Sequence, residues 1–368
     1  MSIIILHLLK QYGISYGYFR LFEYLTFRTM LAAITALLFV MIFGHPVIVA
    51  LYRRRFRDTG GDYASLDASS KRGTPTGGGL LIILAAMLAL LLWGDWNSAY
   101  LLVAVAAFLY FGLVGYLDDL QKVRFKSSLF GLGQMAKTFM QLLFIVPFAL
   151  FFISSWNPVP AAWRTPVLLP FFKNAVFEPA PLLFAAFIVF AYFSIVNAVN
   201  ITDGLDGLVS GPSIMTLSLY GIFSYILGNT VLSSYLLFPY FPGCGELTVF
   251  CGALIGALLG FLWYNTYPAE VFMGDTGSLA LGGSLAALAF LTRQEMLFPI
   301  VGGVFVAMIG SSLLQEKVGM RLGRRIFLRA PIHHSLTHKG VAEPKVVTRL
   351  WIISILLTIL AALSLKLR

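Results

Sequence analysis

The sequence predicts an all-α integral membrane protein with ten transmembrane helices. Of its 368 residues, 59% are hydrophobic and only 11% are charged, whereas soluble domains carry about 25% charged residues. The apolar residues form long continuous runs, and a backbone in lipid satisfies its own hydrogen bonds only as a helix or as a closed barrel. Because the runs do not alternate apolar and polar residues with a period of two, they indicate helices rather than barrel strands.

Each apolar run is expected to form one helix, with boundaries good to about four residues. The runs cover residues 27–52, 77–94, 98–117, 133–153, 181–199, 208–228, 247–264, 276–292, 296–316 and 346–365. The first run lacks a small-residue cleavage site, so it is expected to be a retained span and not a signal peptide. Without a convincing repeat or a soluble domain, residues 1–368 are expected to form a single transmembrane unit.

The basic residues predict the orientation of the chain. Of the 26 lysines and arginines, 18 fall between predicted spans 1 and 2, 3 and 4, and 9 and 10 or, as Lys137 and Arg349 do, near the start of the span that follows. Helix parity places these three stretches on one side, and loops rich in Lys and Arg face the cytoplasm. Residues 317–345 are therefore expected to be a cytoplasmic loop. Both termini, with residues 1–26, and the proline-rich loop 154–180 are expected on the outer, periplasmic side.

The net charge of +10 does not indicate nucleic-acid binding. A nucleic-acid surface needs basic residues interleaved with exposed aromatic residues, and no Lys/Arg tract in this chain has that pattern. The positive-inside rule explains the same charge as loop charge that fixes orientation. No nucleic-acid partner is therefore expected.

Acidic residues at the ends of predicted spans mark a candidate reactive centre. Asp118 and Asp119 are consecutive at the end of the third span, in GYLDDLQK. Close carboxylates repel each other, and the negative end of a helix dipole disfavours them further. The pair is therefore expected to have a cation or a phosphate as its partner, although a solvated helix end is the ordinary alternative.

Two further segments carry polar residues on the same predicted side. In NAVNITDGLDGL, residues 197–208, Asn197 and Asn200 share a helix face, and nearby aspartates sit among glycines that let a ligand approach the backbone. Such a composition is also common in ordinary turns. In the stretch 265–283, Asp275 is the expected N-cap of a helix. Free N–H groups at a helix N-terminus suit phosphate, but Asp is also an ordinary cap.

Two loop segments add groups that can bind anions. KRGTPTGGG, residues 71–79, places Lys71 and Thr76 beside glycines, but it lacks the order of a P-loop and does not imply ATP hydrolysis. APIHHSLTHKG, residues 330–340, contains His333, His334 and His338. Imidazoles bind metals when neutral and phosphates when protonated, and adjacent histidines without further ligands are a weak metal signal.

In this order, the motifs resemble the family of polyprenyl-phosphate N-acetylhexosamine-1-phosphate transferases. The resemblance runs from about Lys71 to the C-terminus, over KRGTPTGGG, LDDLQK, NAVNITDGLDGL, residues 265–283, and PIHH followed by KG. PIHH favours the branch that uses UDP-N-acetylmuramoyl-pentapeptide over the sister branch that uses UDP-N-acetylglucosamine. The resemblance implies a ten-helix enzyme of the bacterial inner membrane, usually a homodimer, with its active site on the cytoplasmic face.

The resemblance also implies roles for individual residues. Asp118, Asp119, Asp275 and His333 would be catalytic, with Asp275 as the ligand of a Mg²⁺ cofactor. Substrate contacts would come from Lys71, Thr76, Lys122, Lys126, Lys137, Asn197, Asn200, Asp203, Asp206, Asn265, Phe272 and His334. Two departures from the family pattern affect these contacts. Ser335 replaces a third histidine, and SSLFGLGQMAK stands where the family has Lys-Gly-Leu, which leaves the equivalents of Lys126 and Lys137 open.

The implied reaction moves phospho-N-acetylmuramoyl-pentapeptide from UDP-N-acetylmuramoyl-pentapeptide onto the membrane lipid undecaprenyl phosphate and releases UMP. The second pKa of a phosphate monoester is about 6, so the lipid phosphate is largely dianionic and can attack without a strong base. A two-step route through an aspartyl-phosphate is the open alternative. In the direct route Asp119 is expected to orient Lys122 while Asp118 faces the attacking oxygen.

A membrane transporter is the alternative of a different class. Transporters keep their charged residues near the bilayer midplane in broken helices. Here the acidic clusters lie at span ends on one side, which favours a reaction between a cytosolic and a lipid substrate.

Overall fold

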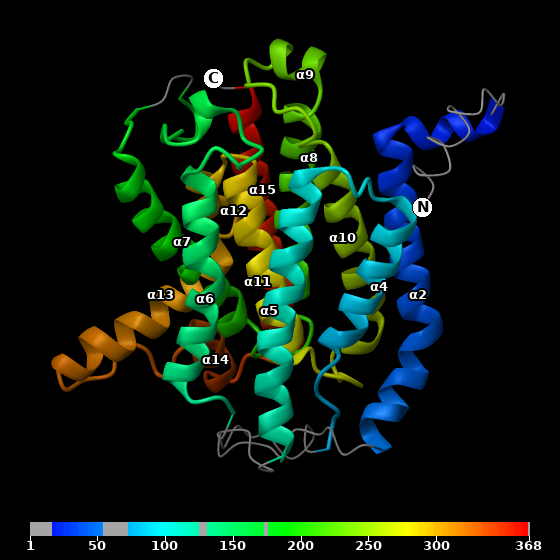
Figure 1. Cartoon of the computed structure of the whole chain (residues 1–368). Coiled ribbons are helices and arrows are strands. Elements are labelled where there is room, and N and C mark those ends of the chain that lie inside the picture. The colour runs from blue at the N-terminus through cyan, green and yellow to red at the C-terminus, as the bar shows by residue number, and fades with distance from the viewer. Residues whose placement is uncertain (1–16, 54–72, 125–130, 173–175, 367–368) are drawn as a thin grey trace.

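The computed structural model describes residues 17–53, 73–124, 131–172 and 176–366, which form a bundle of helices (Figure 1). The helices of more than ten residues are α2 (Leu25–Arg53), α4 (Gly79–Trp93), α5 (Ala99–Arg124), α6 (Gln134–Ile153), α7 (Pro181–Thr202), α8 (Ser210–Leu227), α10 (Glu246–Asn265), α11 (Gly274–Leu291), α13 (Gly303–Leu313) and α15 (Glu343–Ala362). Shorter ones are η1 (Gly17–Glu23), α9 (Thr230–Tyr235), α12 (Phe298–Val301) and α14 (Ile332–His338). An isolated antiparallel bridge pairs Val167 with Phe177.

Each of the ten predicted apolar runs is helical over most of its length. Seven of the described helices are long and apolar enough to cross a bilayer, or eight if one bent pair counts as a single span. Helix α4 has 15 residues, and at about 1.5 Å per residue it is shorter than a hydrocarbon core of about 30 Å. The chain is therefore a multi-pass helical membrane protein, and the number of ten spans stays a prediction.

The ninth predicted run differs from a single straight helix. Residues Glu295–Val301 and Gly303–Gly319 meet at an angle of 83°. The break falls at two consecutive glycines, Gly302 and Gly303, and glycine pairs are a common cause of sharp kinks. Figure 1 shows α13 projecting sideways from the bundle. The predicted loop 317–345 is also partly helical, because it contains α14.

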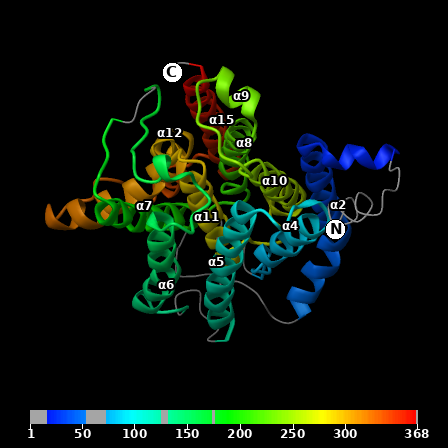
Figure 2. The same cartoon turned by 45° about the horizontal axis from the view of Figure 1, so that its top comes forward.

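Helix α11 occupies the centre of the bundle, and 89% of its apolar window is buried. It packs against α4, α5, α7 and α8, and both views show it among its neighbours (Figures 1 and 2). A Cβ atom on Gly79 of α4 would lie 2.1 Å from the backbone nitrogen of Gly277. A Cβ atom on Gly115 of α5 would lie 2.1 Å from the carbonyl oxygen of Asp275. Small residues thus let two helices approach the first turns of α11.

The outer faces of the bundle are apolar. Helices α2, α6 and α15 carry the exposed side chains Met30, Ile34, Ile42, Phe139, Leu143, Leu150, Ile352, Leu356 and Ile359. Apolar surface of this extent on a single chain marks contact with lipid or with another protein. Together with the apolar spans, it identifies the periphery of the bundle as the lipid-facing surface.

Candidate active site

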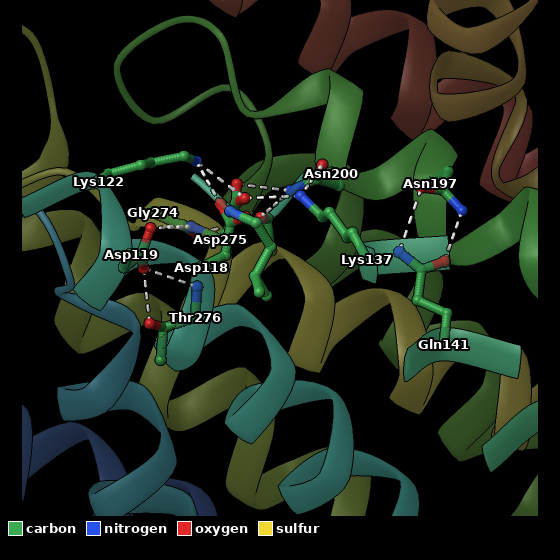
Figure 3. A network of polar contacts seen from close by, with 12 residues as sticks. Asp118, Asp119, Lys122, Lys137, Gln141, Asn197, Asn200, Gly274, Asp275 and Thr276 are labelled. Carbon is green, nitrogen blue, oxygen red and sulfur yellow. Dashed lines mark hydrogen bonds and ion pairs between the residues drawn. The ribbon is translucent and has the colours of Figure 1, made fainter. Parts of the chain in front are cut away.

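Four helix ends meet at one end of the bundle and bring predicted site residues together (Figure 3). Helix α5 ends there, α6 begins there, α7 ends there and α11 begins there. The residues that they contribute are Asp118, Asp119, Lys122, Lys137, Asn197, Asn200 and Asp275. Segments that are far apart in the sequence therefore form one polar centre.

Asp275 lies at the middle of this centre. Its Oδ2 atom accepts hydrogen bonds from the Nζ atom of Lys122 at 2.9 Å and from that of Lys137 at 2.6 Å. Its Oδ1 atom accepts a hydrogen bond from Asn200 Nδ2 at 2.9 Å. Hydrogen bonds between ionised groups are stronger than those between neutral ones. Two ammonium groups and an amide therefore hold this carboxylate in one orientation.

Asp118 shares one of these lysines. Its Oδ2 atom lies 2.7 Å from Lys122 Nζ, and its Oδ1 atom accepts a hydrogen bond from the backbone N–H of Leu132 at 2.8 Å. Lys122 thus bridges Asp118 and Asp275. The expectation that Asp119 orients Lys122 was wrong. Asp118 does so, because it lies one full helical turn before the lysine.

Asp119 instead caps helix α11. Its carboxylate accepts hydrogen bonds from the backbone N–H groups of Asp275 at 3.0 Å and Thr276 at 2.9 Å, and from the Thr276 hydroxyl at 2.6 Å. A helix leaves such N–H groups without intrahelical partners. The Asp119 carboxylate of α5 therefore accepts from the N–H groups of Asp275 and Thr276. These two N–H groups are not free to bind phosphate, which the sequence had suggested for the start of this helix.

Gly274 allows this close approach. Its φ of +71° lies in the left-handed region that glycine adopts readily. A Cβ atom there would lie 2.6 Å from Asp119 Oδ2 and 2.9 Å from Thr76 Oγ1. Phe272 lies two residues before Gly274. Its backbone N–H donates to the carbonyl of Pro75, and its carbonyl accepts from the N–H of Gly78, both at 2.9 Å. Thr76 and Phe272, both predicted substrate contacts, thus lie beside the aspartates.

The three aspartates form a candidate metal centre. One carboxylate oxygen from each of Asp118, Asp119 and Asp275 lies within 4.8 Å of the others. Hard divalent cations take carboxylate oxygens as ligands. The three carboxylates and the ammonium groups of Lys122 and Lys137 together carry a formal charge of −1. The donor set therefore fits a divalent cation that shares Asp275 with two lysines.

A second polar pair lies one helical turn from Lys137. Asn197 Nδ2 donates to Gln141 Oε1 at 2.8 Å, and Gln141 Nε2 donates to Asn197 Oδ1 at 3.4 Å. Gln141 is buried. Sequence analysis did not identify it, because a single glutamine belongs to no motif. Its position four residues after Lys137 in an otherwise apolar run was the available signal.

Asn265 and Asp206 connect two loops near the centre. Asn265 Oδ1 accepts from the backbone N–H of Gly207 at 3.0 Å, and its Nδ2 donates to the carbonyl of Val271 at 2.8 Å. Asp206 Oδ2 accepts from the N–H of Ala269 at 3.1 Å. Both side chains are buried. They join the turn after α7 to the loop after α10, and their contact with substrate stays a prediction.

The turn after α7 also borders the two predicted histidines. A Cβ atom on Gly204 would lie 2.4 Å from His333 Nε2 and 3.3 Å from His334 Nε2. Asp203 precedes this glycine. Burial raises the pKa of Asp203 to about 8, and the nearby carboxylates of Asp275 and Asp119 act in the same direction. The raised pKa favours the protonated form of Asp203, which can donate a hydrogen bond.

His333 is fully buried on α14. Its Nδ1 atom lies 3.1 Å from Met308 Sδ, and its Nε2 atom has no hydrogen-bond partner among the described residues. Burial lowers the pKa of His333 to about 3, and the His334 ring contributes in the same direction. His333 is therefore neutral at physiological pH, and any catalytic role would use the neutral imidazole rather than a cation.

The buried His333 should make the protein less stable in acid. The pKa of about 3 in the folded protein lies below the usual value of about 6.5, so unfolding lets the ring bind a proton. The contribution is fully present above pH 6.5 and is lost as the pH falls toward 3. Between pH 7 and 5 the wild type should lose about 2 kcal/mol relative to His333→Gln. Thermal melts at both pH values test this, and parallel curves for the two proteins would contradict it.

Two predicted substrate contacts, Lys71 and Lys126, lie outside the described residues. The other residues of the predicted set lie within the described residues, and Figure 3 shows seven of them close to one another: Asp118, Asp119, Lys122, Lys137, Asn197, Asn200 and Asp275. The apolar spans and this centre of aspartates, lysines and asparagines define a class: a multi-pass membrane protein with a candidate site for a metal ion and an anionic substrate.

Comparison with known proteins agrees with this class. The family model described as glycosyl transferase family 4 matches residues 100–293. The chain is 46% identical to the phospho-N-acetylmuramoyl-pentapeptide-transferase of Citrifermentans bemidjiense over 98% of this chain and 99% of that protein. The proteins of the same name from Geobacter sp. (strain M21) and Syntrophus aciditrophicus are each 45% identical, with the same coverage. The chain therefore belongs to glycosyl transferase family 4.

Proposed function

We propose that the protein transfers phospho-N-acetylmuramoyl-pentapeptide from UDP-N-acetylmuramoyl-pentapeptide to undecaprenyl phosphate in peptidoglycan biosynthesis. The products are a diphosphate-linked lipid, lipid I, and UMP. The observation that carries this proposal is that relatives 42–46% identical over nearly the whole chain are phospho-N-acetylmuramoyl-pentapeptide-transferases by name. The Asp–Lys centre at the end of the bundle supplies groups that suit a reaction between two phosphates.

The chemistry balances as a substitution at phosphorus. An oxygen of the lipid phosphate forms a bond to the β-phosphorus of the nucleotide sugar. The bond from that phosphorus to the bridging oxygen breaks, and UMP leaves with the electron pair. Both reactants are anions, so their repulsion must be offset. Lys122 and Lys137, paired with Asp275 at 2.9 and 2.6 Å, are the described cations placed to do so.

In the direct route, Asp118 orients Lys122 beside the attacking phosphate. In the two-step route, an aspartate carboxylate attacks first and the lipid phosphate then displaces the phosphosugar. We favour direct attack because Asp118 and Asp275 are already engaged by ammonium groups, which lower the nucleophilicity of a carboxylate. UMP released in stoichiometric amount from lipid-free enzyme, with a phosphosugar left on an aspartate, would establish the two-step route instead.

The proposed cofactor is Mg²⁺, held by Asp275 with Asp118 and Asp119 close enough to complete the carboxylate set. When bound, it would neutralise negative charge on the diphosphate. Around it, Asn200 orients Asp275 through a hydrogen bond of 2.9 Å. The proposed contacts with the uridine and its phosphates come from Lys71, Asn200, Asp203, Asp206 and Phe272.

The proposed location is the bacterial inner membrane, with this centre facing the cytoplasm, both termini in the periplasm and a homodimer as the assembly. The support for this orientation is the 18 basic residues that fall on one side by helix parity. Gln134 and Ser155 are exposed at opposite ends of α6. Cysteines introduced at these positions should react with a membrane-impermeant reagent from opposite sides in vesicles. Labelling of both from one side would reject the proposed topology.

UMP formation tests the proposed activity. We expect purified protein to release UMP from UDP-N-acetylmuramoyl-pentapeptide only when undecaprenyl phosphate is present. Release with UDP-N-acetylglucosamine and not with the muramoyl-pentapeptide substrate would assign the chain to the sister activity. Absence of UMP release with either nucleotide, together with substrate uptake into proteoliposomes, would favour a transporter.

A further inference from the structure

We propose that Gln141, paired with Asn197, is a positioning residue that aims Lys137 at Asp275. The inference deepens the proposed function and rests on it for its turnover measurement only. Lys137 lies on helix α6, which is buried on one face only. Only 28% of its apolar window is buried, against 89% for the central helix α11. The orientation of α6 therefore depends on the contacts of one face, where Gln141 lies with Ile145, Phe148, Ala149 and Phe152.

In lipid, no hydrophobic driving force favours one rotation of a helix, because the surrounding lipid is equally apolar. Side-chain packing and polar contacts between helices set the rotation. Helix α6 has exposed apolar side chains such as Phe139 and Leu143 on its outer face, and it packs chiefly on α7. The Tyr110 hydroxyl of α5 donates to the carbonyl of Met140 at 2.6 Å, and a polar contact between α6 and α7 adds a second constraint that keeps the inner face of α6 turned toward the site.

Two sets of polar contacts, one turn of α6 apart, join α6 to neighbouring helices. In the first, Lys137 Nζ lies 2.6 Å from Asp275 Oδ2 and 3.5 Å from Asn200 Oδ1. In the second, one turn farther from the site, the amides of Gln141 and Asn197 exchange two hydrogen bonds (Figure 3). Asn197 also donates to the carbonyl of Phe193 at 2.8 Å, which fixes the orientation of its own amide.

The spacing of these residues lets the Gln141–Asn197 contact position Lys137 against Asp275. Lys137 and Gln141 are four residues apart on α6, and Asn197 and Asn200 are three apart on α7, so each pair shares one helix face. Gln141 is 1% exposed, so it contacts no solvent and is not exposed to a substrate. Gln141 therefore acts through Lys137, by fixing the rotation of α6 and its position along the helix axis.

The test compares Gln141→Leu with Gln134→Leu, which makes the same chemical change at an exposed position of the same helix. The first readout is the rate at which an amine-acylating reagent modifies Lys137, measured by mass spectrometry. An ammonium held by a carboxylate reacts slowly, so Gln141→Leu should raise the rate several-fold while Gln134→Leu leaves it unchanged. This readout does not depend on the proposed activity.

The second readout is UMP formation. Gln141→Leu should lower turnover about 10- to 100-fold, because small displacements of a catalytic group have effects of this size. Exchanging the two side chains, Gln141→Asn with Asn197→Gln, keeps the combined length of the pair and should recover most of the lost turnover and the slow Lys137 labelling. Melting temperatures of all variants show whether the bundle itself is intact.

The proposal is overturned if Lys137 labels at the wild-type rate in Gln141→Leu, whatever the turnover. It is also overturned if the exchanged pair stays as impaired as Gln141→Leu. If the wild type forms no UMP while Gln141→Leu still accelerates labelling of Lys137, the proposed activity fails and the positioning role stands.

Discussion

Replacing Asp275 with asparagine should lower UMP formation by about a thousandfold or more, a loss of about 4 kcal/mol of transition-state stabilisation. Asp275 accepts hydrogen bonds from Lys122, Lys137 and Asn200. The change removes the charge that holds both ammonium groups and that would hold the cation. Turnover measured across a Mg²⁺ titration should show no recovery at ordinary concentrations, because a neutral amide is a weak ligand for Mg²⁺.

A suitable control is Asp95→Asn. Asp95 lies between α4 and α5, at the other end of α5 from Asp118, and its Oδ1 atom accepts only local hydrogen bonds from Asn97 at 3.1 and 3.2 Å. This variant should keep its turnover and its Mg²⁺ dependence. Near-normal activity of Asp275→Asn would show that this carboxylate is not the metal ligand, and the metal assignment would have to move to the remaining aspartates.

The sequence predicts the helices of this protein well because the bilayer imposes a simple rule. A span must be long and continuously apolar, and each predicted run is helical over most of its length. Helix α8 was predicted as a span and is a helix of 18 residues, but it is not among the seven helices that pass by length and hydropathy, so its span stays a prediction. The apolarity rule does not predict a bend such as the 83° break between α12 and α13.

The candidate site was predictable in its membership but not in its contacts. Asp118, Asp119 and Asp275 were recognised from charge clustering at span ends, and the structure places them within reach of one metal ion. The partner of each one depends on how α5 and α11 pack, which Gly115 and Gly274 determine at close range. Sequence spacing alone could therefore not assign the α11 cap to Asp119, whereas the four-residue spacing of Asp118 and Lys122 was an available signal for their contact.

Gln141 illustrates the other limit. Its importance, as proposed, comes from the contact with Asn197 on α7, and that contact exists only after two helices have packed. A polar residue in an apolar run is a weak signal by itself, because side chains such as Ser218 and Ser224 satisfy themselves by bonding to their own helix. A glutamine on the same face as a lysine is a better signal, because its longer amide reaches a neighbouring helix.

The neighbouring aspartates Asp118 and Asp119 should respond differently to the same substitution. Asp119 accepts three hydrogen bonds at the first turn of α11. An asparagine there would place an amide N–H₂ group against N–H donors and would remove the charge that complements the helix dipole. Because Asp119 is buried, Asp119→Asn should lower the free energy of unfolding by about 2 kcal/mol and should also reduce turnover by displacing Asp275.

Asp118→Asn should reduce turnover strongly, about a hundredfold or more, with little change in stability. The amide oxygen can still accept the hydrogen bond from the N–H of Leu132, and Lys122 keeps its contact with Asp275 at 2.9 Å. Binding of the nucleotide sugar should be nearly unchanged, because the proposed uridine contacts lie in other segments.

Thermal melts, UMP formation and direct nucleotide-sugar binding, measured on both variants, separate the two roles. Equal losses of stability in Asp118→Asn and Asp119→Asn would contradict the assignment of Asp119 as the α11 cap. Unchanged turnover in Asp118→Asn would remove Asp118 from the reacting centre.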